Sequence, residues 1–116
     1  MKRTILFICS ANKQRSKTAE DYFSSKYADL EFMSAGTNNK ICEQEGTNPI
    51  TSVILEQADL IFVMENSHKK EIKNFINGRF KKEIIVLDIK DIYKYYQQEL
   101  IELLEKKNNS LFKGLI

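Results

Sequence analysis

Short apolar runs alternate with helix-forming segments along this chain, and no other feature limits its fold so strongly. Four runs have the length and continuity of strands buried on both faces: residues 4–9, 30–33, 60–64 and 83–87. Four segments have the spacing or the start signals of helices: residues 16–27, 49–57, 67–76 and 97–107. Strands and helices in this order predict an α/β fold, a parallel sheet with helices on both faces.

Residues that start or stop helices set the predicted boundaries. Pro49 suits the first turn of one helix, Ser67 is a predicted N-cap, and the Asn-Gly pair at 77–78 is a predicted stop. The polar stretch 38–48 is predicted as a loop. The chain contains neither a repeat nor a Pro/Gly/Ser-rich linker, so residues 1–116 are predicted to form one domain.

The composition excludes several classes of protein. One His and two Cys are too few for a structural zinc site with four nitrogen or sulfur ligands, and no metal or cofactor is expected. The net charge of +2 argues against a dedicated nucleic-acid binder. No apolar run approaches the ~20 residues of a membrane span, and the N-terminus lacks the features of an export signal. We therefore expect a cytoplasmic protein with reduced thiols and with no nucleic-acid or membrane partner.

The loop after the first strand has the composition of an anion site, at the sheet edge where parallel sheets bind ligands. Five residues separate Cys9 from Arg15, between a buried strand and the start of a helix. Backbone N–H groups of such a loop can turn inward, and the positive end of the helix joins them. The predicted phosphate-binding residues are Ser10, Ala11, Asn12, Lys13, Gln14, Arg15 and Ser16.

Cys9 and Arg15 supply the nucleophile and the phosphate-binding cation that this anion site needs for catalysis. Arg15 supplies a planar, charged fork for two phosphate oxygens. The helix end and the Arg favour the thiolate form of Cys9, which is placed to attack phosphorus in line. The alternative is a buried structural Cys, a common occupant of strands. We favour the anion site, because this Cys–Arg spacing at a strand–helix junction is rare by chance.

The chain resembles the low-molecular-weight protein tyrosine phosphatases in three motifs. The first is an apolar strand followed by C-x-x-N-x-x-R-S, here within residues 5–20. The second is Ser-Ala-Gly-Thr at 34–37, and the third is Ala-Asp-Leu-Ile-Phe-Val-Met at 58–64. The short form looks most like a compact bacterial and archaeal branch of predicted phosphatases. The resemblance implies a single-domain, three-layer sandwich whose four-stranded parallel sheet has the order 2-1-3-4.

The resemblance also implies roles for individual residues. Cys9 matches the nucleophile that becomes phosphocysteine, and Arg15 matches the residue that grips the phosphate. Asn12 matches an Asn that holds the shape of the loop. Ser16 matches a hydroxyl that donates to the thiolate and eases its departure in the second step. Ser34 matches a Ser that supports this arrangement through a hydrogen bond.

A thiolate nucleophile needs a partner acid, because the leaving oxygen departs poorly without a proton. The resemblance implies an Asp in an Asp-Pro-Tyr loop after the fourth strand. Asp91 starts the matching segment, with Ile92 in place of Pro, so we favour Asp91 over Asp88 as the acid. The alternatives are a helix cap at Asp91 and a turn carboxylate at Asp88. Tyr93 matches an aromatic residue that flanks the pocket.

Several residues depart from the family pattern or lie outside it. Lys13 and Lys94 near the mouth suit a more anionic substrate than a phosphotyrosine peptide. Gln14 replaces a second loop Cys, so no vicinal disulfide is expected at the nucleophile. Cys42 is either a resolving thiol for the oxidised nucleophile or, as favoured here, a surface thiol. His68 is expected to be a solvated surface residue.

Together these features predict a phosphomonoester hydrolase, specifically a cysteine-dependent protein tyrosine phosphatase. Its substrate would be a phosphorylated protein or a small aryl phosphate. Arsenate reductase is a less favoured alternative, because the chain has no cysteine beyond Cys42 to continue a thiol relay. A non-catalytic phosphate or phosphopeptide binder is the third possibility, supported by the missing Pro after Asp91.

Overall fold

The computed structural model describes residues 2–76 and 82–115, and within them four parallel strands form one sheet in the order β2-β1-β3-β4. The strands are β1 (Arg3–Cys9), β2 (Leu30–Gly36), β3 (Leu60–Val63) and β4 (Ile84–Val86). The helices are α1 (Arg15–Lys26), α2 (Asn39–Glu45), α3 (Ser52–Gln57), α4 (Asn66–Phe75) and α5 (Gln98–Leu115). The predicted α/β class and strand order are therefore confirmed.

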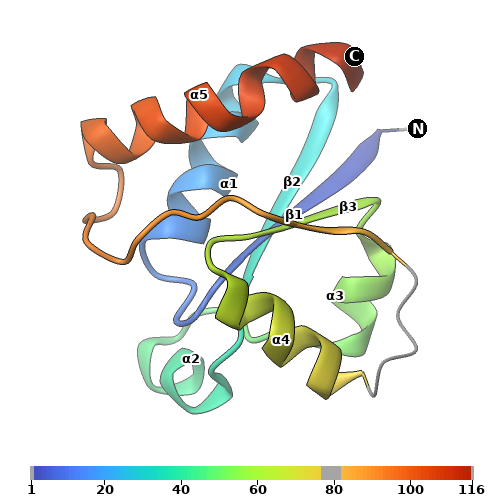
Figure 1. The fold of residues 1–116 in the computed structure, drawn as a ribbon, viewed down its shortest axis with the longest axis vertical. Coiled ribbons are helices and arrows are strands. Elements are labelled where there is room, and N and C mark those ends of the chain that lie inside the picture. Colours follow the sequence, from blue (N-terminus) through green and yellow to red (C-terminus); the bar gives the residue numbers. More distant parts are fainter. Residues whose placement is uncertain (1, 77–81, 116) are drawn as a thin grey trace.

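Helices cover both faces of the sheet, and β1 and β3 are its two inner strands (Figure 1). Successive side chains of a strand point to opposite faces. Phe7 and Cys9 of β1 pack with residues of α1 and α5, whereas Leu6 and Ile8 pack with residues of α3 and α4. A sheet buried on both faces explains why the strands are continuously apolar in sequence.

An aromatic cluster holds α1 and α5 on their face of the sheet. The ring of Phe7 stacks on those of Phe62 and Phe23, with centroids 5.5 Å and 5.8 Å away. Phe112 of α5 meets Phe23 of α1 edge-on at 4.9 Å. Aromatic pairs contribute about 0.5–1.5 kcal/mol each beyond their burial. The cluster therefore positions α1, whose first residue is Arg15.

A helix lies where the sequence predicted a loop. α2 follows Asn38, whose side chain accepts the Ile41 N–H at 3.1 Å, and ends before Gly46, whose φ is 70°. The loop prediction was wrong because α2 carries only Ile41 and Cys42 as apolar side chains, too few for a periodic pattern. Its buried residue is Cys42, which faces the loop after β1.

Other helix boundaries also differ from the prediction. The helix predicted from Pro49 starts at Ser52, because Pro49 pairs with Gly36 at the end of β2. Glu65, rather than Ser67, is the residue that caps α4. The last helix runs eight residues beyond its predicted end, to Leu115. The predicted stop at 77–78 lies outside the described residues.

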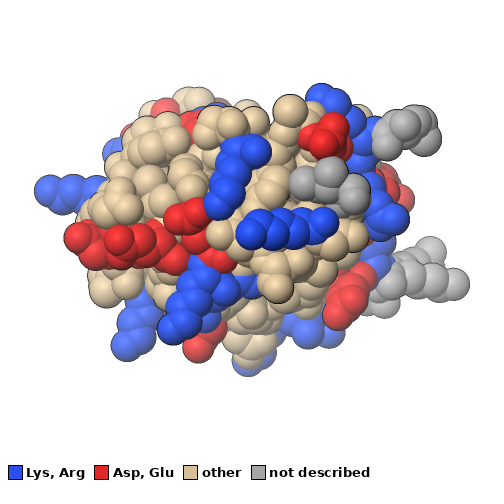
Figure 2. Space-filling model, turned by 90° about the horizontal axis from the view of Figure 1, so that it is seen from above, with Lys and Arg blue, Asp and Glu red and all other residues tan. Residues whose placement is uncertain are grey.

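Charged side chains of both signs are interspersed on the face shown in Figure 2. Such mixing keeps that face free of a large patch of one sign, in line with the net charge of +2. Among the described residues, no helix is long and apolar enough to cross a membrane.

Gly36, at the end of β2, leaves room for two neighbouring segments. A Cβ at this position would lie 2.4 Å from the carbonyl oxygen of Ser10 and 2.6 Å from Sγ of Cys42. Both distances are shorter than van der Waals contact, so any side chain here must displace the loop after β1 or α2. A glycine is therefore required at position 36, because the loop after β1 and the Cys42 side chain both come too close for a Cβ.

We expect Gly36→Ala to lower the free energy of unfolding by about 1–3 kcal/mol, because the added methyl overpacks this junction. Gly114→Ala in α5 is the matched control, since a Cβ there meets no atom within 4 Å. Replacing a helical Gly should raise stability by up to about 1 kcal/mol. Urea unfolding of both variants measures the difference, and equal effects would contradict the close-approach argument.

Candidate active site

Segments that follow the parallel strands converge at one edge of the sheet and line a pocket of about 230 Å³. The loop after β1 (residues 10–14), which we call the phosphate loop after its predicted role, lines the pocket together with Cys9. α2 follows β2 and contributes Ile41. The segment after β4 contributes Asp91. The pocket is lined by Cys9, Ser10, Ala11, Lys13, Gln14, Arg15, Ile41 and Asp91.

The phosphate loop is held from outside by the segment around α2. The Ser10 carbonyl accepts the Asn38 N–H at 3.0 Å, and the Ala11 carbonyl accepts the Thr47 hydroxyl at 2.6 Å. A trans peptide is planar, so its N–H points opposite to its carbonyl. The Ala11 N–H therefore points away from Asn38, on the side of the loop that lines the pocket.

Asn12 holds the bend of the loop. Its φ is 53°, a left-handed conformation that Asn tolerates better than most residues, and it is buried. Its side-chain oxygen accepts the Asn48 N–H at 3.1 Å, and its side-chain nitrogen donates to Ser16 Oγ at 2.9 Å. The side chain that permits the bend therefore also ties the loop to α1 and to the residues beyond α2.

Cys9 lies at the base of the pocket with only 3% of its surface exposed. Its Sγ is 3.0 Å from Ser16 Oγ, in the first turn of α1. Because Ser16 Oγ already accepts a hydrogen bond from Asn12, its own proton is free to point at the sulfur. The geometry thus allows a hydrogen bond from the Ser16 hydroxyl to the sulfur.

Arg15 is buried beside Cys9 and is balanced by negative partners. Its Nη1 donates to the Glu65 carboxylate and to the Ile89 carbonyl, both at 2.7 Å. Its Nε lies 3.6 Å from a carboxylate oxygen of Asp91. A buried cation is costly unless it is paired and hydrogen-bonded. The ends of β3 and β4 therefore supply the charge that lets Arg15 face the pocket.

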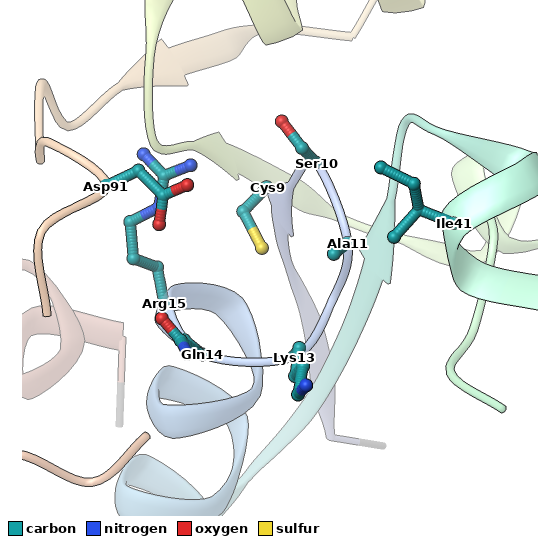
Figure 3. Close-up of a pocket in the computed structure, with 8 residues that line it drawn as sticks. All are labelled: Cys9, Ser10, Ala11, Lys13, Gln14, Arg15, Ile41 and Asp91. Atoms are coloured by element: carbon teal, nitrogen blue, oxygen red, sulfur yellow. The ribbon is translucent and has the colours of Figure 1, made fainter. Parts of the chain in front are cut away.

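Asp91 and Ile41 lie on opposite sides of the sulfur (Figure 3). The Asp91 carboxylate is beside the Arg15 guanidinium, and 64% of its side chain is exposed. Asp88, the other candidate acid, is exposed with a φ of 57° and is not among the described residues that line the pocket. Of the two Asp residues, Asp91 lines the pocket and Asp88 does not.

The segment that carries Asp91, residues 89–96, is held by hydrogen bonds at both ends. At its start, the Ile89 N–H donates to the Met64 carbonyl at 2.8 Å. At its far end, the Tyr96 N–H donates to the buried Thr18 Oγ1 of α1 at 2.8 Å. Tyr95 donates its hydroxyl proton to Asp21 at 2.5 Å, a bond that raises the pKa of Tyr95 to about 12.

Three residues predicted in or near the site have contacts that the sequence did not indicate. Tyr93 is half-buried against the core cluster of α1 and α5 and is not among the described pocket-lining residues. Ser34 is buried and donates to the Glu20 carboxylate of α1. Lys13 lines the pocket, but its ammonium is 3.2 Å from Glu45 of α2.

Cys42 is buried, so the expectation of a surface thiol is wrong. Its Sγ lies 3.6 Å from the Ala11 carbonyl and 3.8 Å from the Ser10 carbonyl, on the outer side of the phosphate loop. The loop backbone therefore separates Cys42 from the pocket, which holds Cys9. Cys42 packs the loop from behind because α2, which the sequence did not predict, carries it there.

His68 is also buried, so the expectation of a solvated His is wrong. Its Nε2 is 3.0 Å from Ser10 Oγ, and its Nδ1 accepts the Glu65 N–H at 3.1 Å. Burial and the nearby Arg15 guanidinium lower the pKa of His68 below its usual 6.5. The sequence placed His68 on a helix, but it could not show that the helix N-terminus packs against the phosphate loop.

Reasoning from sequence missed Glu65, His68 and Ile41 as parts of this site. The only signal for Glu65 was its position directly after the third strand, where ligand-binding loops lie. No sequence signal pointed to Ile41, since the helix that carries it was not predicted. Among the described residues, no group of three or more His, Cys, Asp or Glu side chains could hold a metal ion.

No protein-family model matches the chain, and no curated protein matches it. Solved structures do match. One is the tyrosine phosphatase Wzb from Escherichia coli K30 in complex with phosphate, with a TM-score of 0.75 and 24% identity over 100% of both chains. Another is SP-PTP, a low molecular weight protein tyrosine phosphatase from Streptococcus pyogenes, with a TM-score of 0.79 and 17% identity over 98% of this chain and 93% of that one.

A third similar structure is the arginine phosphatase YwlE, of Bacillus subtilis, in a variant with a phosphorylated active-site serine. Its TM-score is 0.72 and its identity 24%, over 95% of this chain and 96% of that one. All three similarities extend over nearly the whole length of both chains. They show that this chain has the fold of the low-molecular-weight protein tyrosine phosphatases.

Proposed function

We propose that residues 1–116 form one domain that hydrolyses phosphomonoesters as a cysteine-dependent protein tyrosine phosphatase. The observation that carries the proposal is the contact of 3.0 Å between Cys9 Sγ and Ser16 Oγ at the base of a pocket. Arg15 and Asp91 line the same pocket. The reaction needs a nucleophile, a phosphate-binding cation and an acid together, and few other functions need all three.

In the first step, Cys9 attacks phosphorus while the loop amides and Arg15 hold the phosphate oxygens. The S–P bond forms, the bond from phosphorus to the ester oxygen breaks, and Asp91 gives its proton to that oxygen. Asp91 is suited to this role because it is exposed at the open side of the pocket, where the leaving group would lie. The product is an alcohol or phenol, and the enzyme keeps the phosphoryl group as phosphocysteine.

In the second step, water attacks the phosphocysteine. The Asp91 carboxylate takes a proton from the water, the S–P bond breaks, and inorganic phosphate leaves. The sulfur departs as a thiolate, and the Ser16 hydroxyl is placed to donate to it. Because the reaction needs a reduced sulfur, we propose that the protein works in a reducing compartment such as the cytoplasm.

The walls of the pocket favour a phosphorylated aromatic group as substrate. Ile41 and Ala11 provide apolar surface across the pocket from Asp91. The ring of a leaving phenol between them would pack on this surface while its oxygen lies within reach of Asp91. Lys13 is paired with Glu45, so this pair at the rim carries no net charge. These contacts suit a phosphotyrosine side chain better than a highly anionic substrate. The similarity to an arginine phosphatase makes phosphoarginine the second substrate to assay.

We expect Cys9→Ser to lose about 10³-fold or more in turnover of p-nitrophenyl phosphate, since a Ser hydroxyl is a poor nucleophile without a general base. Its affinity for inorganic phosphate should stay close to that of the wild type, because the amides and Arg15 remain. Steady-state kinetics and calorimetry measure the two effects.

Cys42→Ser is the matched control, because its hydroxyl can still donate to the carbonyls that Cys42 faces. It should keep wild-type turnover. Full turnover by Cys9→Ser would overturn the mechanism. A wild type that binds phosphate but hydrolyses no ester would instead favour the non-catalytic binder, and arsenate-dependent thiol oxidation would favour arsenate reductase.

We expect Asp91→Asn to slow kcat for a phosphotyrosine peptide by about 10²–10⁴-fold, because Asn cannot protonate the leaving oxygen. The loss should be smaller for p-nitrophenyl phosphate, whose leaving group departs readily without a proton. Asp88→Asn is the control and should stay near the wild type, as Asp88 lies outside the pocket lining. The reverse pattern would assign the acid to Asp88.

We expect Ile41→Ser to raise KM for aryl phosphates by about 3–10-fold with little change in kcat, because the apolar wall contacts the leaving group and not phosphorus. Val53→Ser is the control, since Val53 is also an exposed aliphatic residue on a short helix but lines a different surface. An unchanged KM in Ile41→Ser would argue against an aromatic substrate. Assays with phosphotyrosine and phosphoarginine peptides would then compare the two substrates directly.

A further inference from the structure

We propose that neutral His68 is a positioning residue that ties the phosphate loop to the N-terminus of α4 and thereby couples the loop to the partner of Arg15. The inference rests on the proposed function, since it assigns His68 a part in phosphate binding and turnover. His68 does not line the pocket, so it acts through Ser10 and Glu65 and not on substrate.

The two contacts of the imidazole determine its tautomer. A backbone N–H can only donate, so Nδ1 must accept the proton of Glu65 N–H and carries none itself. In the neutral ring the proton therefore lies on Nε2. Nε2 must then donate to Ser10 Oγ at 3.0 Å, and Ser10 Oγ must accept.

This imidazole joins two groups that both serve the proposed phosphate site. On one side is Ser10, the first residue of the phosphate loop, directly after Cys9. On the other side is Glu65, whose carboxylate is 2.7 Å from Arg15 Nη1. Ser10 of the phosphate loop and Glu65, whose carboxylate binds Arg15, are thus linked through one buried ring.

His68 does more than cap α4. It is the third residue of that helix, a position where Glu or Gln commonly accepts the N–H of the capping residue. Glu could perform that function but has no proton to give to Ser10. A neutral His accepts with one nitrogen and donates with the other, so it can bind both groups in a fixed geometry.

Protonation of His68 would break this link. The charged ring has two N–H groups and no acceptor, so the bond from Glu65 N–H would be lost. The groups that face it are Arg15 from α1, Glu65 at the start of α4, Glu71 within α4 and Asp91 from the segment after β4. Burial and Arg15 oppose the charge more than the carboxylates favour it, which lowers the pKa of His68.

The tautomer can be observed directly, because this chain contains one His. In ¹⁵N-His-labelled protein near pH 7, we expect the nitrogen spectrum to show an unprotonated Nδ1 and a protonated Nε2. The opposite tautomer, or two averaged nitrogens, would overturn the proposal whether or not the protein has phosphatase activity.

Two substitutions separate the link to the loop from the helix cap. His68→Asn keeps an oxygen near the place of Nδ1 but cannot reach Ser10, and Ser10→Ala removes the acceptor while leaving His68 in place. We expect each to weaken binding of inorganic phosphate and lower kcat/KM about tenfold, as the loss of a buried hydrogen bond would. The double variant should be no worse than either single variant, because both remove the same bond.

A role in helix capping alone predicts a different result. His68→Asn would then keep wild-type phosphate affinity, and His68→Ala would lower the thermal midpoint of unfolding without changing kcat/KM. Either outcome would overturn the proposal. Phosphate affinity is measured by calorimetry and needs no catalysis, so it tests the role of His68 even if the chain hydrolyses no ester.

The pH dependence gives an independent readout. Phosphate affinity of the wild type should fall as pH drops through the His68 titration, with the midpoint that the nitrogen spectrum reports. His68→Asn should show no fall in phosphate affinity at that midpoint. Its affinity should change with pH only through the titration of phosphate itself and of the pocket groups that both proteins share. Identical pH profiles for the two proteins would contradict the proposal.

Discussion

The arrangement of this site depends on how the buried charge of Arg15 is compensated. Its Nη1 binds the Glu65 carboxylate and the Ile89 carbonyl at 2.7 Å each, and Asp91 lies near Nε. Removing a charge from water costs several kcal/mol unless partners replace the water. The start of α1 and the segments after β3 and β4 must therefore meet at one point, which is also where a phosphate would bind.

The phosphate loop is shaped from its outer side. Asn38 and Thr47 hold the carbonyls of Ser10 and Ala11 away from the pocket, and Cys42 fills the space behind them. The same packing explains the glycine at 36, because a side chain there would collide with both the loop and the thiol.

Much of the fold followed from local patterns, and the errors have a common cause. Continuous apolar runs predicted the four strands, and the spacing of Cys9 and Arg15 predicted a loop that lies at the pocket. The polar stretch 38–48 was misassigned because α2 is short and has one buried residue. Cys42 and His68 were both expected at the surface, since nothing in a residue's own neighbourhood shows which distant segment will cover it.

The sequence by itself determined the α/β class and the strand–loop–helix unit that brings Cys9, Asn12, Arg15 and Ser16 together, because these residues are close along the chain. Only the tertiary structure decided which distant groups complete the site. Glu65 and His68 reach it from the segment after β3, and Ile41 reaches it from an unpredicted helix. Asp91, which the family resemblance favoured, lines the pocket from the segment after β4. Their placement depends on how β1, β3 and β4 align in the sheet and on where α2 packs, which are non-local results of packing the core.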